Sequence, residues 1–485
     1  MRRRSVLAAM VAPAAAGTAA VWPAAARADY TTTPDPGIGW GVWEGWGTSL
    51  AWWANVFGDR NDIADALFTT RDVTIGATTV PGLGMNIVRY NLGGCSRQPA
   101  GGASMVASPK IPAFKQIEGY WLNWNSSDPA SPSWNWYADS KQRNALWKAR
   151  DRGVNHFELF SDSPMWWMCT NHNPSGAADG GNNLQSWNYL QHAVYLATVA
   201  RYAKDRWGFQ FTSMDAFNEP SAPWWKADGT QEGCHVDAAI QAQVIGHLKR
   251  ELSARGLSTV IAASDETSYD QARATWAALG AARAHVGKIN VHGYQYEGGR
   301  RDLLYTDARA AGKRLWQSEY GDGDATGLRL AVNLNLDMRA LHPTAWVYWQ
   351  ALDGADWGMI TVDEPNAVIG AVRTKYSVMA QYSRHIRPGM RIIESGDANT
   401  VAAYDQSKRR LVLVSLNRGP AQYIGYDLSA FGRVGATSIS RWATDTTEGG
   451  QRYSYHTDTV MNGTRFWSWF NPGMVQTFQI ENVDV

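Results

Sequence analysis

Eight short runs of strand-forming residues recur along residues 43–352, and longer segments of helical character separate them. In two of those segments, residues 187–207 and 238–255, apolar side chains recur at helical spacing. Regular alternation of strands and helices is typical of βα units that build a parallel sheet. The strand-like runs lie at residues 43–50, 85–94, 155–161, 210–217, 259–263, 288–294, 314–319 and 345–352. We therefore predict an α/β fold, a (β/α)8 TIM barrel over residues 41–385.

An open, doubly wound sheet is the alternative arrangement, and the first run argues against it. Such a sheet carries a glycine-rich phosphate-binding turn after its first strand. Gly45-Trp46-Gly47 lacks the third, spaced glycine and the helix that would follow it. Residues 95–140, rich in Pro, Ser, Asn and Trp, predict a long loop over the top of the barrel.

The pattern changes after about residue 385. Short runs at residues 400–404, 411–416, 438–442 and 475–480 alternate with Gly, Asn and Asp turns. This spacing predicts an antiparallel β-sandwich over residues 386–485. We expect it to be a structural companion of the barrel, and a second sugar-binding face is the alternative.

The N-terminus has the features of an export signal. Three arginines, Arg2 to Arg4, precede an apolar run that ends in Ala26-Arg27-Ala28. This order predicts a signal peptide over residues 1–28, and Arg3-Arg4-Ser5-Val6-Leu7 resembles the twin-arginine type. We therefore expect a secreted, extracellular protein.

Charge and hydropathy limit the kinds of partner. The net charge is +1, with 45 Lys and Arg against 44 Asp and Glu, and no charge block follows the first residues. These features argue against nucleic acid and membrane surfaces as partners. No later apolar run is long enough to span a bilayer. We expect a monomer.

The three cysteines, Cys95, Cys169 and Cys234, allow one disulfide with one free thiol, or none. Cys169 and Cys234 follow the third and fourth strand-like runs, so a bond between them is one alternative. The spacing fits no zinc site, and His292 has no partner cluster. We predict no metal and no cofactor.

Two glutamates end strand-like runs in matching positions. Glu219 lies between Asn218 and Pro220 after the fourth run, and Glu319 ends the seventh. Barrel enzymes collect catalytic groups at the C-terminal ends of their strands. Glycoside hydrolysis needs two carboxyl groups that flank the scissile bond. One such glutamate alone would be better interpreted as a capping or salt-bridged residue, but the pair predicts a glycosidase.

The two carboxyl groups have different tasks. Glu219, as acid/base, must hold a proton near neutral pH, whereas Glu319, as nucleophile, must stay ionised. Hydrogen-bond donors such as Arg89 or Tyr294 would favour the ionised form. Arg89 has a second interpretation as a buried salt bridge of the barrel, and both remain open. Retaining chemistry further requires the carboxyl groups to lie roughly 5 Å apart.

Aromatic residues are abundant, with 25 Trp, 20 Tyr and 12 Phe. Their flat apolar faces match sugar rings, although we expect most of them to be core. His292 and Tyr294 alternate on the sixth run and therefore face the same side. We predict a polysaccharide or oligosaccharide substrate, and the candidate substrate-binding residues are Trp46, Arg89, Asn91, Ser161, Trp166, Asn218, His292, Tyr294 and Trp349.

Four motifs in this order resemble glycoside hydrolase family 30. They are Arg89-Tyr90-Asn91-Leu92-Gly93-Gly94, Ser163-Pro164-Met165-Trp166-Trp167-Met168, Asn218-Glu219-Pro220 and Ser318-Glu319-Tyr320. Asn-Glu-Pro alone is shared by many barrel glycosidases, whereas the whole set is more specific. In that family N-terminal residues complete the sandwich, so the resemblance implies that residues 29–40 join it.

Within the family, two local features are similar to endo-β-1,6-galactanases. They are Cys95 directly after Gly93-Gly94, and Trp224-Trp225 followed by Gln231-Glu232-Gly233-Cys234. The resemblance implies retaining hydrolysis of β-1,6-galactan side chains of arabinogalactan proteins. Ser161 stands where other branches carry Trp, which implies room for the axial O4 of galactose.

Two alternative functions remain beside this hypothesis, together with one rival for a catalytic role. Another family-30 activity, such as a β-1,6-glucanase, a xylanase or an exo-acting glycosidase, is the nearest. A non-catalytic carbohydrate-binding protein on a barrel scaffold is more distant, because it would need neither Glu219 nor Glu319. Glu232 is a rival carboxylate, but it lies in a loop, so we expect a substrate contact or a structural bond there.

Overall fold

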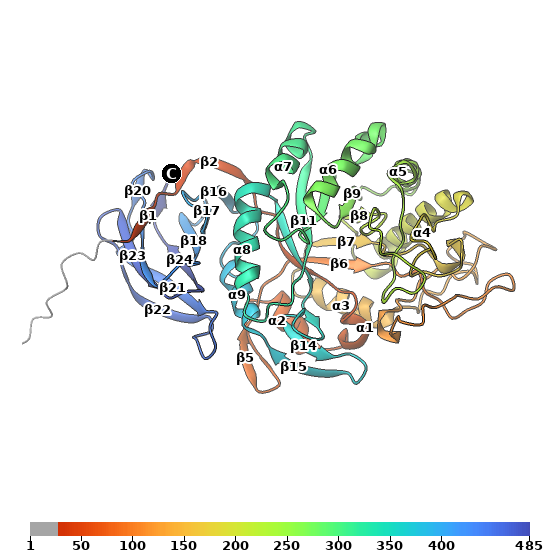
Figure 1. Ribbon diagram of the computed structural model, residues 1–485, viewed down its shortest axis with the longest axis horizontal. Helices are drawn as coiled ribbons and strands as arrows, with labels where there is room; N and C mark the ends of the chain where they lie inside the picture. Colours follow the sequence, from red (N-terminus) through yellow and green to blue (C-terminus); the bar gives the residue numbers. More distant parts are fainter. Residues whose placement is uncertain (1–27) are drawn as a thin grey trace, which may run out of the picture.

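Eight parallel strands close into a barrel in the computed structural model (Figure 1). The structure describes residues 28–485, so the predicted signal peptide lies outside the described residues except for its last residue. Each predicted run overlaps one barrel strand, which confirms the predicted fold class. The strands are β3 (Gly45–Ser49), β6 (Ile87–Asn91), β7 (His156–Phe160), β8 (Ser213–Asp215), β9 (Val260–Glu266), β10 (Lys288–His292), β11 (Arg314–Tyr320) and β12 (Ala345–Gln350).

Helices surround the barrel and bury its outer face. In α5, the apolar residues Val244, Ile245, Leu248 and Leu252 recur on one side and are all buried, as expected for an amphipathic helix. Turns of π-helix extend α4 over Ala203–Trp207 and α8 over Asp337–Leu341. The helices are α1 (Ala54–Phe57), α2 (Asn61–Phe68), α3 (Ser140–Arg150), α4 (Tyr189–Tyr202), α5 (Ala238–Ala254), α6 (Tyr269–Ala278), α7 (Arg301–Ala310), α8 (Leu328–Leu336) and α9 (Thr374–Ser383).

Charged side chains, and not only apolar ones, fill the barrel interior. Glu158 of β7 is fully buried and accepts hydrogen bonds from Arg89 Nε (3.0 Å) and from the Lys288 ammonium group. Asn290 Nδ2 donates to the same carboxylate (2.8 Å). Buried charges persist only when they are paired and hydrogen-bonded, and this cluster meets that condition. Through Arg89 this cluster is connected to Glu319, at the C-terminal end of β11.

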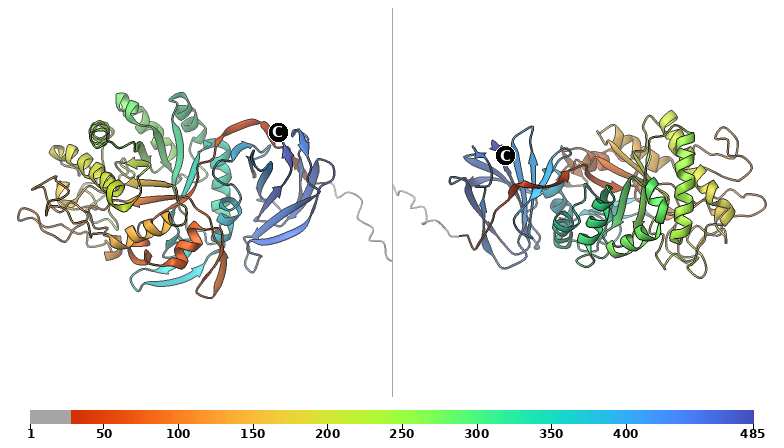
Figure 2. Two further views of the ribbon diagram at one scale, coloured as in Figure 1. Left: turned by 180° about the vertical axis from the view of Figure 1, so that it is seen from behind. Right: turned by 90° about the horizontal axis from the view of Figure 1, so that it is seen from above.

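The C-terminal module is a sandwich of two sheets (Figures 1 and 2). The larger sheet has the order β2-β16-β17-β18-β24-β21-β22, and the smaller has the order β1-β19-β23. Pairing is antiparallel except between β1 and β19. The strands are β1 (Tyr30–Thr32), β2 (Asp35–Val42), β16 (Arg391–Glu394), β17 (Thr400–Asp405), β18 (Arg410–Leu416), β19 (Gln422–Asp427), β21 (Ser438–Asp445), β22 (Ser454–Val460), β23 (Arg465–Phe470) and β24 (Met474–Ile480), with a small ribbon of β20 (Arg433–Val434) and β25 (Val483–Asp484).

The N-terminal segment contributes one strand to each sheet of the sandwich. Tyr30 of β1 pairs with Ile424, and Val42 of β2 pairs with Arg391. Figure 2 shows this segment crossing from the module to the barrel. The segment that we expected to join the sandwich, residues 29–40, therefore lies in these two strands and the turn between them.

The central strands β17, β18 and β24 of the large sheet are buried on both faces. Leu411 and Phe478 belong to an apolar cluster between the two sheets, whereas Val412 and Val414 belong to the core that continues into the barrel. On that side the sheet meets α9, and Thr477 Oγ1 donates to the Gln381 carbonyl oxygen (2.8 Å). This double burial fits a structural companion that is packed firmly on the barrel.

Two small sheets and a long irregular segment complete the barrel domain. A hairpin of β4 (Asp72–Ile75) and β5 (Thr78–Pro81) follows α2, and β13 (Leu352–Asp353), β14 (Ile360–Asp363) and β15 (Val368–Val372) follow β12. Residues 92–139 contain one 3₁₀ turn at Ala113–Lys115 and otherwise form loops. The long loop was predicted from the sequence, whereas the two small sheets were not.

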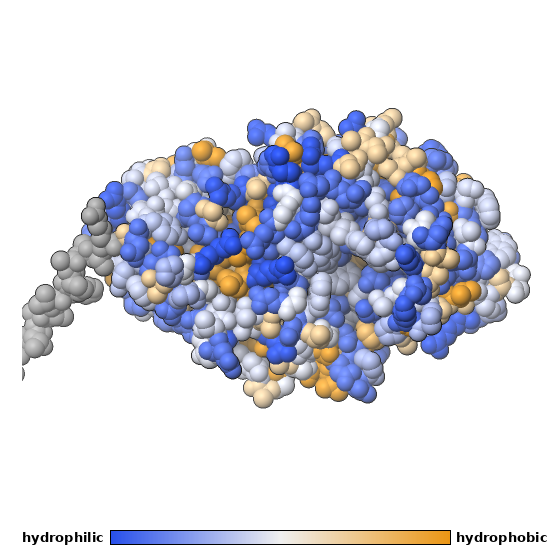
Figure 3. All heavy atoms as spheres, viewed as in Figure 1, coloured by the Kyte–Doolittle hydropathy of each residue, from blue (hydrophilic) through white to orange (hydrophobic). Residues whose placement is uncertain are grey.

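The three cysteines are buried and form no disulfide in the described chain. Of the alternatives left open by the sequence, the structure therefore has the one without a bond. Figure 3 shows a mainly hydrophilic face with small, scattered hydrophobic patches. Over residues 28–485, no helix combines the length and the apolar character needed to cross a membrane.

Candidate active site

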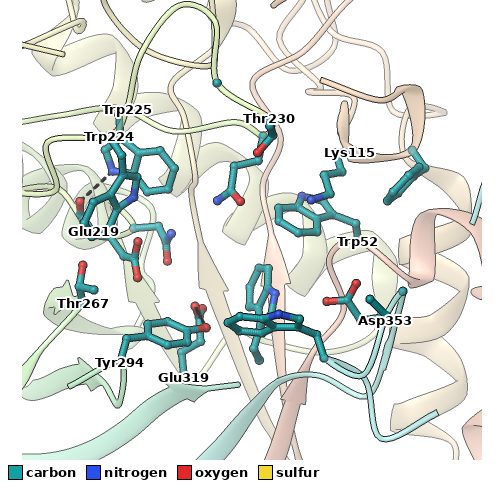
Figure 4. Close-up of a pocket in the computed structure, with 18 of the residues that line it drawn as sticks. Trp52, Lys115, Glu219, Trp224, Trp225, Thr230, Thr267, Tyr294, Glu319 and Asp353 are labelled. Carbon is teal, nitrogen blue, oxygen red and sulfur yellow. Dashed lines mark hydrogen bonds between the residues drawn. The ribbon is translucent and has the colours of Figure 1, made fainter. Parts of the chain in front are cut away.

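A pocket of about 960 Å³ opens at the C-terminal ends of the barrel strands. Figure 4 shows the carboxyl groups of Glu219 and Glu319 pointing into it, with Trp224 and Trp225 on one side and Trp52 across the pocket. The mouth of a barrel is the usual place of its active site. The lining residues are Trp52, Phe114, Lys115, Asn218, Glu219, Trp224, Trp225, Gly229, Thr230, Gln231, Thr267, Tyr294, Tyr296, Glu319, Trp349, Asp353, Gly354, Ala355, Trp357 and Glu364.

Glu219 and Glu319 lie close together although a hundred residues separate them. One carboxyl oxygen of each, together with a ring nitrogen of His292, lies within 4.8 Å of the others. His292 Nδ1 lies 2.9 Å from Glu219 Oε1 and 3.3 Å from Glu319 Oε1. Carboxyl pairs of retaining glycosidases lie roughly 5 Å apart, and those of inverting enzymes roughly 6.5 to 9.5 Å. This geometry is therefore of the retaining kind.

The backbone of Glu219 has an uncommon conformation. Its φ is +45°, in the left-handed region that residues other than glycine seldom adopt. Three hydrogen bonds hold it: the Glu219 N–H donates to the Asp265 carbonyl (2.9 Å), and its own carbonyl accepts from the Ala222 N–H (3.0 Å) and from Trp225 Nε1 (2.8 Å). Backbone strain of this kind persists where the surroundings fix it, and here it aims a carboxyl group into the pocket.

Three donors surround Glu319. Arg89 Nη1 donates to Glu319 Oε2 (2.9 Å), Tyr294 OH donates to Oε1 (2.9 Å), and His292 lies beside Oε1. Burial nevertheless raises the pKa of the Glu319 carboxyl to about 7, against the opposing charges of His292 and Arg89. The nearby Glu219 charge adds to that rise. Arg89 and Tyr294 therefore donate to Glu319 as we expected. The raised pKa differs from our expectation of a nucleophile that stays ionised, because burial of the carboxyl group disfavours its charged form.

Asp265 of β9 connects the cations of the site. It accepts hydrogen bonds from Arg89 Nη2 and from Ser318 Oγ (2.6 Å), and His292 Nε2 lies 3.1 Å from its Oδ1. Burial alone would lower the pKa of His292, but the charges of Glu319 and Asp265 outweigh it and hold that pKa well above its usual value. The raised pKa favours the protonated form of His292, which can donate from Nδ1 toward the carboxyl pair.

The same three groups could in principle hold a metal ion. Glu219, His292 and Glu319 offer one ligand atom each within a 4.8 Å spread. The charge distribution opposes this use, because a metal-ligating histidine must be neutral and His292 carries a raised pKa. The Arg89 guanidinium already occupies one side of Glu319.

Aromatic rings and a charged cluster form the rest of the pocket. Trp52 and Trp349 meet edge to face, with ring centroids 5.1 Å apart, and Lys115 Nζ lies 3.9 Å from the centre of the Trp52 ring. Burial raises the pKa of Asp353, which also lines the pocket, to about 6. A hollow with flat apolar walls and a few polar groups suits a sugar chain.

The structure brings most of the predicted site residues together. Asn218, Glu219, Tyr294, Glu319 and Trp349 line the pocket. Two further ones, Arg89 and His292, lie directly beneath it and contact the carboxyl groups as described above. Arg89 also pairs with Glu158, so both interpretations of this residue apply.

Four predicted substrate contacts do not reach the pocket and need correction. Trp46 is fully buried and donates from Nε1 to the Ile386 carbonyl (2.7 Å), on the side of the barrel that faces α9. Asn91 Nδ2 donates to Asp162 Oδ2 (2.9 Å) within the protein. Trp166 is fully buried and packs edge to face on His172.

Ser161 is the fourth of these residues. Its hydroxyl donates to the Ser163 carbonyl (2.9 Å) in its own loop, and its side chain is buried. It therefore does not border the sugar site, and the suggestion that it makes room for the axial O4 of galactose is not supported by this position.

Several residues that line the pocket were not predicted from the sequence. Trp52 and Asp353 follow the first and eighth strands, so their place just after a strand end was an available signal. Trp224, Trp225 and Gln231 were noted as family features but not as pocket residues. Phe114 and Lys115 come from the long loop, where no pattern in the sequence marks them.

Glu232, the rival carboxylate, is fully buried outside the pocket. The Gly94 N–H donates to its Oε1 (2.8 Å) and Asn91 Nδ2 to its Oε2 (3.3 Å). Burial raises the pKa of this carboxyl to about 7. Glu232 therefore ties the loop after β8 to the segment after β6, which is the structural bond that we expected as one alternative.

Comparisons with known proteins give a consistent result. Residues 35–284 match the model of O-glycosyl hydrolase family 30. The chain is 54% identical over 462 residues to the endo-β-1,6-galactanase of Hypocrea rufa, and this alignment covers 94% of this chain and 96% of that enzyme. It is 26% identical over 494 residues to an exo-β-1,6-galactobiohydrolase of Bifidobacterium longum, with 76% of this chain and 32% of that protein covered.

Solved structures agree on the fold. The catalytic domain of the family-30 xylanase C from Talaromyces cellulolyticus superposes with a TM-score of 0.68 at 20% identity, and the match covers 93% of this chain and 100% of that one. At this identity the likeness concerns the architecture of barrel and β-module alone.

Proposed function

Because the chain belongs to O-glycosyl hydrolase family 30, we propose that it is a retaining endo-β-1,6-galactanase with Glu319 as nucleophile and Glu219 as acid/base. The observation that carries the substrate is the 54% identity over almost the whole length of both chains to an enzyme of that name. The observation that supports retention is the short separation of the two carboxyl groups.

The reaction begins with attack of a Glu319 carboxylate oxygen on the anomeric carbon of a galactose unit. Glu219 gives its proton to the departing O6 of the next unit, so the glycosidic bond breaks and a covalent galactosyl–Glu319 ester forms. Glu219, now ionised, then takes a proton from water as that water attacks the same carbon. The ester bond breaks, Glu319 leaves as a carboxylate, and the anomeric configuration is retained.

The competent form carries one proton, on Glu219, with Glu319 ionised. Arg89, Tyr294 and His292 all face Glu319, so the ionised form of that carboxyl receives the larger number of hydrogen bonds. Glu219 Oε1 faces only His292 among these donors. We propose that this asymmetry directs the shared proton toward Glu219.

Residues around Glu219 and Glu319 are the candidates for binding the substrate. Asn218 lines the pocket next to Glu219, and its Oδ1 has no hydrogen-bond partner within residues 28–485. We propose that this oxygen accepts a hydrogen bond from a hydroxyl group of the sugar. The rings of Trp52 and Trp224 line the pocket on either side of the carboxyl pair (Figure 4), and Trp349 lines it as well. Such an arrangement suits binding of sugar units on each side of the cleaved bond.

The Glu219→Gln variant is expected to keep an ionised nucleophile down to a pH below about 7. The pKa of about 7 belongs to Glu319 beside an ionised Glu219, and the neutral glutamine removes that like charge, so the pKa of Glu319 falls. A 2,4-dinitrophenyl β-galactobioside needs no acid help, and its kcat/KM reports the ionised nucleophile. We therefore expect the acid-side decline of the variant to lie below about pH 7. A decline of the variant that stays near that pH would show that the two carboxyl groups are not coupled.

Metal removal is expected to leave activity unchanged. The cationic His292 and Arg89 already supply positive charge to the carboxyl pair. The measurement is the rate on β-1,6-galactan before and after dialysis against EDTA. A loss of activity that one added divalent ion restores would assign a metal to the three-residue cluster.

The substrate is tested by product analysis. We expect the chain to release a ladder of oligosaccharides from arabinogalactan after its arabinose is removed, and to leave β-1,6-glucan and xylan intact. Immediate release of one short product would favour the exo mode of the Bifidobacterium longum relative. Binding without any cleavage would favour a non-catalytic carbohydrate-binding protein.

The proposal includes export and a monomeric state. Residues 1–28 have the order of a signal peptide, so we expect the mature chain to begin at about Asp29. N-terminal sequencing of protein from the culture medium tests this, and light scattering tests whether the mass is that of one chain.

A further inference from the structure

A second cavity, of about 620 Å³, shares no lining residue with the catalytic pocket. Four of the residues that line it are tryptophans: Trp121, Trp124, Trp167 and Trp187. We call it the tryptophan cavity. It lies in the loops after β6 and β7, at the end of the barrel away from the β-sandwich (Figures 1 and 2).

We propose that the tryptophan cavity binds a segment of the same neutral β-1,6-galactan that the catalytic pocket cleaves. This inference rests on the proposed function for the identity of the sugar. Its physical basis is the combination of exposed indole rings, free polar groups and absence of charge in the lining.

The exposed rings are the first part of that basis. Trp187 is 71% exposed and Trp124 is 48% exposed, which are large values for tryptophan. Exposed rings beside a hollow are typical of binding sites, and indole faces suit the C–H faces of sugar rings. Isolated exposed aromatics need no such explanation, but here both border one cavity.

A stack of packed indole rings lies behind Trp124. Trp167 is buried, donates from Nε1 to the Trp121 carbonyl (2.8 Å) and meets Trp124 edge to face at 5.8 Å. Trp121 stacks on Trp134 with centroids 4.9 Å apart, and Trp134 stacks on Trp136 at 5.2 Å. A preformed frame lowers the entropy lost on binding.

Gly101 shows how closely Trp124 is seated. A Cβ atom at Gly101 would come within 2.2 Å of Trp124 Cζ2, so only glycine leaves room for the ring there. The ring of Trp124 is therefore placed by packing against this loop even though about half of it faces solvent.

The polar groups of the cavity suit a neutral polyhydroxylated ligand. Asn125 and Ser127 line it, and their side chains make no hydrogen bond within the described part of the chain. Gln191 adds an Oε1 without a partner among residues 28–485, whereas the amides of Gln185 and Asn188 already bond each other (2.6 Å). The described lining contains no Asp, Glu, Lys or Arg, unlike the catalytic pocket with its Lys115, which argues against a charged ligand.

One loop connects the two hollows. The Val106 N–H donates to the carbonyl of His172, which lines the tryptophan cavity (2.9 Å). Ser108 Oγ donates to the carbonyl of Gly229, which lines the catalytic pocket (2.6 Å). A polysaccharide held in the cavity therefore stays next to the catalytic pocket, which raises its effective concentration there.

The test compares Trp124→Ala and Trp187→Ala with Trp469→Ala, a control of similar exposure (45%) on β23 of the sandwich. All three are made in the Glu319→Gln background, and their retardation is measured in gels that contain β-1,6-galactan. We expect the two cavity variants to bind about two- to ten-fold more weakly and the control to bind unchanged. In the active enzyme, kcat/KM should fall by a similar factor on the polysaccharide and stay constant on an aryl β-galactobioside.

Equal retardation of the cavity variants and the Trp469→Ala control would overturn the inference. A fall on the short substrate as well would also overturn it, because the rings would then act at the catalytic pocket. If the unmodified enzyme cleaves another polysaccharide and not β-1,6-galactan, the proposed function fails separately. In that case, retardation in gels with β-1,6-galactan still tests whether the tryptophan cavity binds this polysaccharide, because the gels measure binding without cleavage.

Discussion

Replacing Glu319 by glutamine is expected to lower kcat on β-1,6-galactan by about 10,000-fold or more, because the variant has no nucleophile to form the covalent intermediate. The amide keeps the size of the side chain: its one carbonyl oxygen can still accept from Arg89 and its NH2 group can donate to the Tyr294 hydroxyl, so the fold should be preserved. A Glu319→Ala variant supplied with azide and an activated aryl galactobioside should yield the α-galactosyl azide, since azide then attacks from the nucleophile's side.

Glu232→Gln is the matched control for this variant. It also neutralises a fully buried carboxyl, but that carboxyl contacts Gly94 and Asn91 and not the pocket. We expect it to keep most of the activity. If Glu319→Gln kept full hydrolysis, or Glu232→Gln lost as much activity with its fold intact, the assignment of the nucleophile would be wrong.

Replacing Glu219 by alanine is expected to lower kcat on the polysaccharide by about 100- to 10,000-fold, the range for loss of a general acid–base. The loss should be much smaller for the first step on a 2,4-dinitrophenyl galactobioside, whose leaving group needs no proton. Hydrolysis of the intermediate still needs a base, so the galactosyl-enzyme should accumulate and a burst of dinitrophenol should appear.

Azide separates this role from a merely structural one. As an anion that needs no base, it should speed turnover of the Glu219→Ala variant and yield the β-galactosyl azide, with retained configuration. No acceleration by azide, together with an equal loss on both substrates, would indicate that Glu219 shapes the site without transferring a proton.

The barrel could be predicted from the sequence because its signal repeats eight times. Strand-like runs at regular distance leave few arrangements other than a closed parallel barrel, and each run overlaps an observed strand. The small sheets were not predictable in the same way. The strands β13 to β15 are short and follow β12 without a periodic pattern, yet β13 supplies Asp353 and the turn after it supplies Trp357 to the pocket.

Site residues could be predicted where the position of a residue along a strand decides whether its side chain reaches the barrel mouth. Glu219 and Glu319 follow or end strands whose C-terminal ends meet at the barrel mouth. Prediction failed for Trp46 and Trp166, because aromatic residues near a strand can face either the mouth or the surrounding helices. Only packing distinguishes the two, and both rings are buried away from the pocket.

The part of the charge network that centres on Asp265 could not be predicted from the sequence. Asp265 contacts both Arg89 and His292, and through them it acts on the carboxyl pair, but its strand carried no feature that pointed to this role. The pKa of Glu319 is likewise raised by burial and by the charge of Glu219, and only the folded chain brings these two causes together. The raised pKa of the nucleophile therefore emerges only in the folded chain.

Trapping the covalent intermediate tests the central claim most directly. The enzyme is incubated with a 2,4-dinitrophenyl 2-deoxy-2-fluoro-β-1,6-galactobioside, whose fluorine slows hydrolysis of the intermediate more than it hinders use of the activated leaving group. Peptides are then analysed by mass spectrometry. We predict one added fluorogalactobiosyl group per chain, on the peptide and at the position of Glu319. A label on any other residue, or product of inverted configuration with no label, would contradict the account.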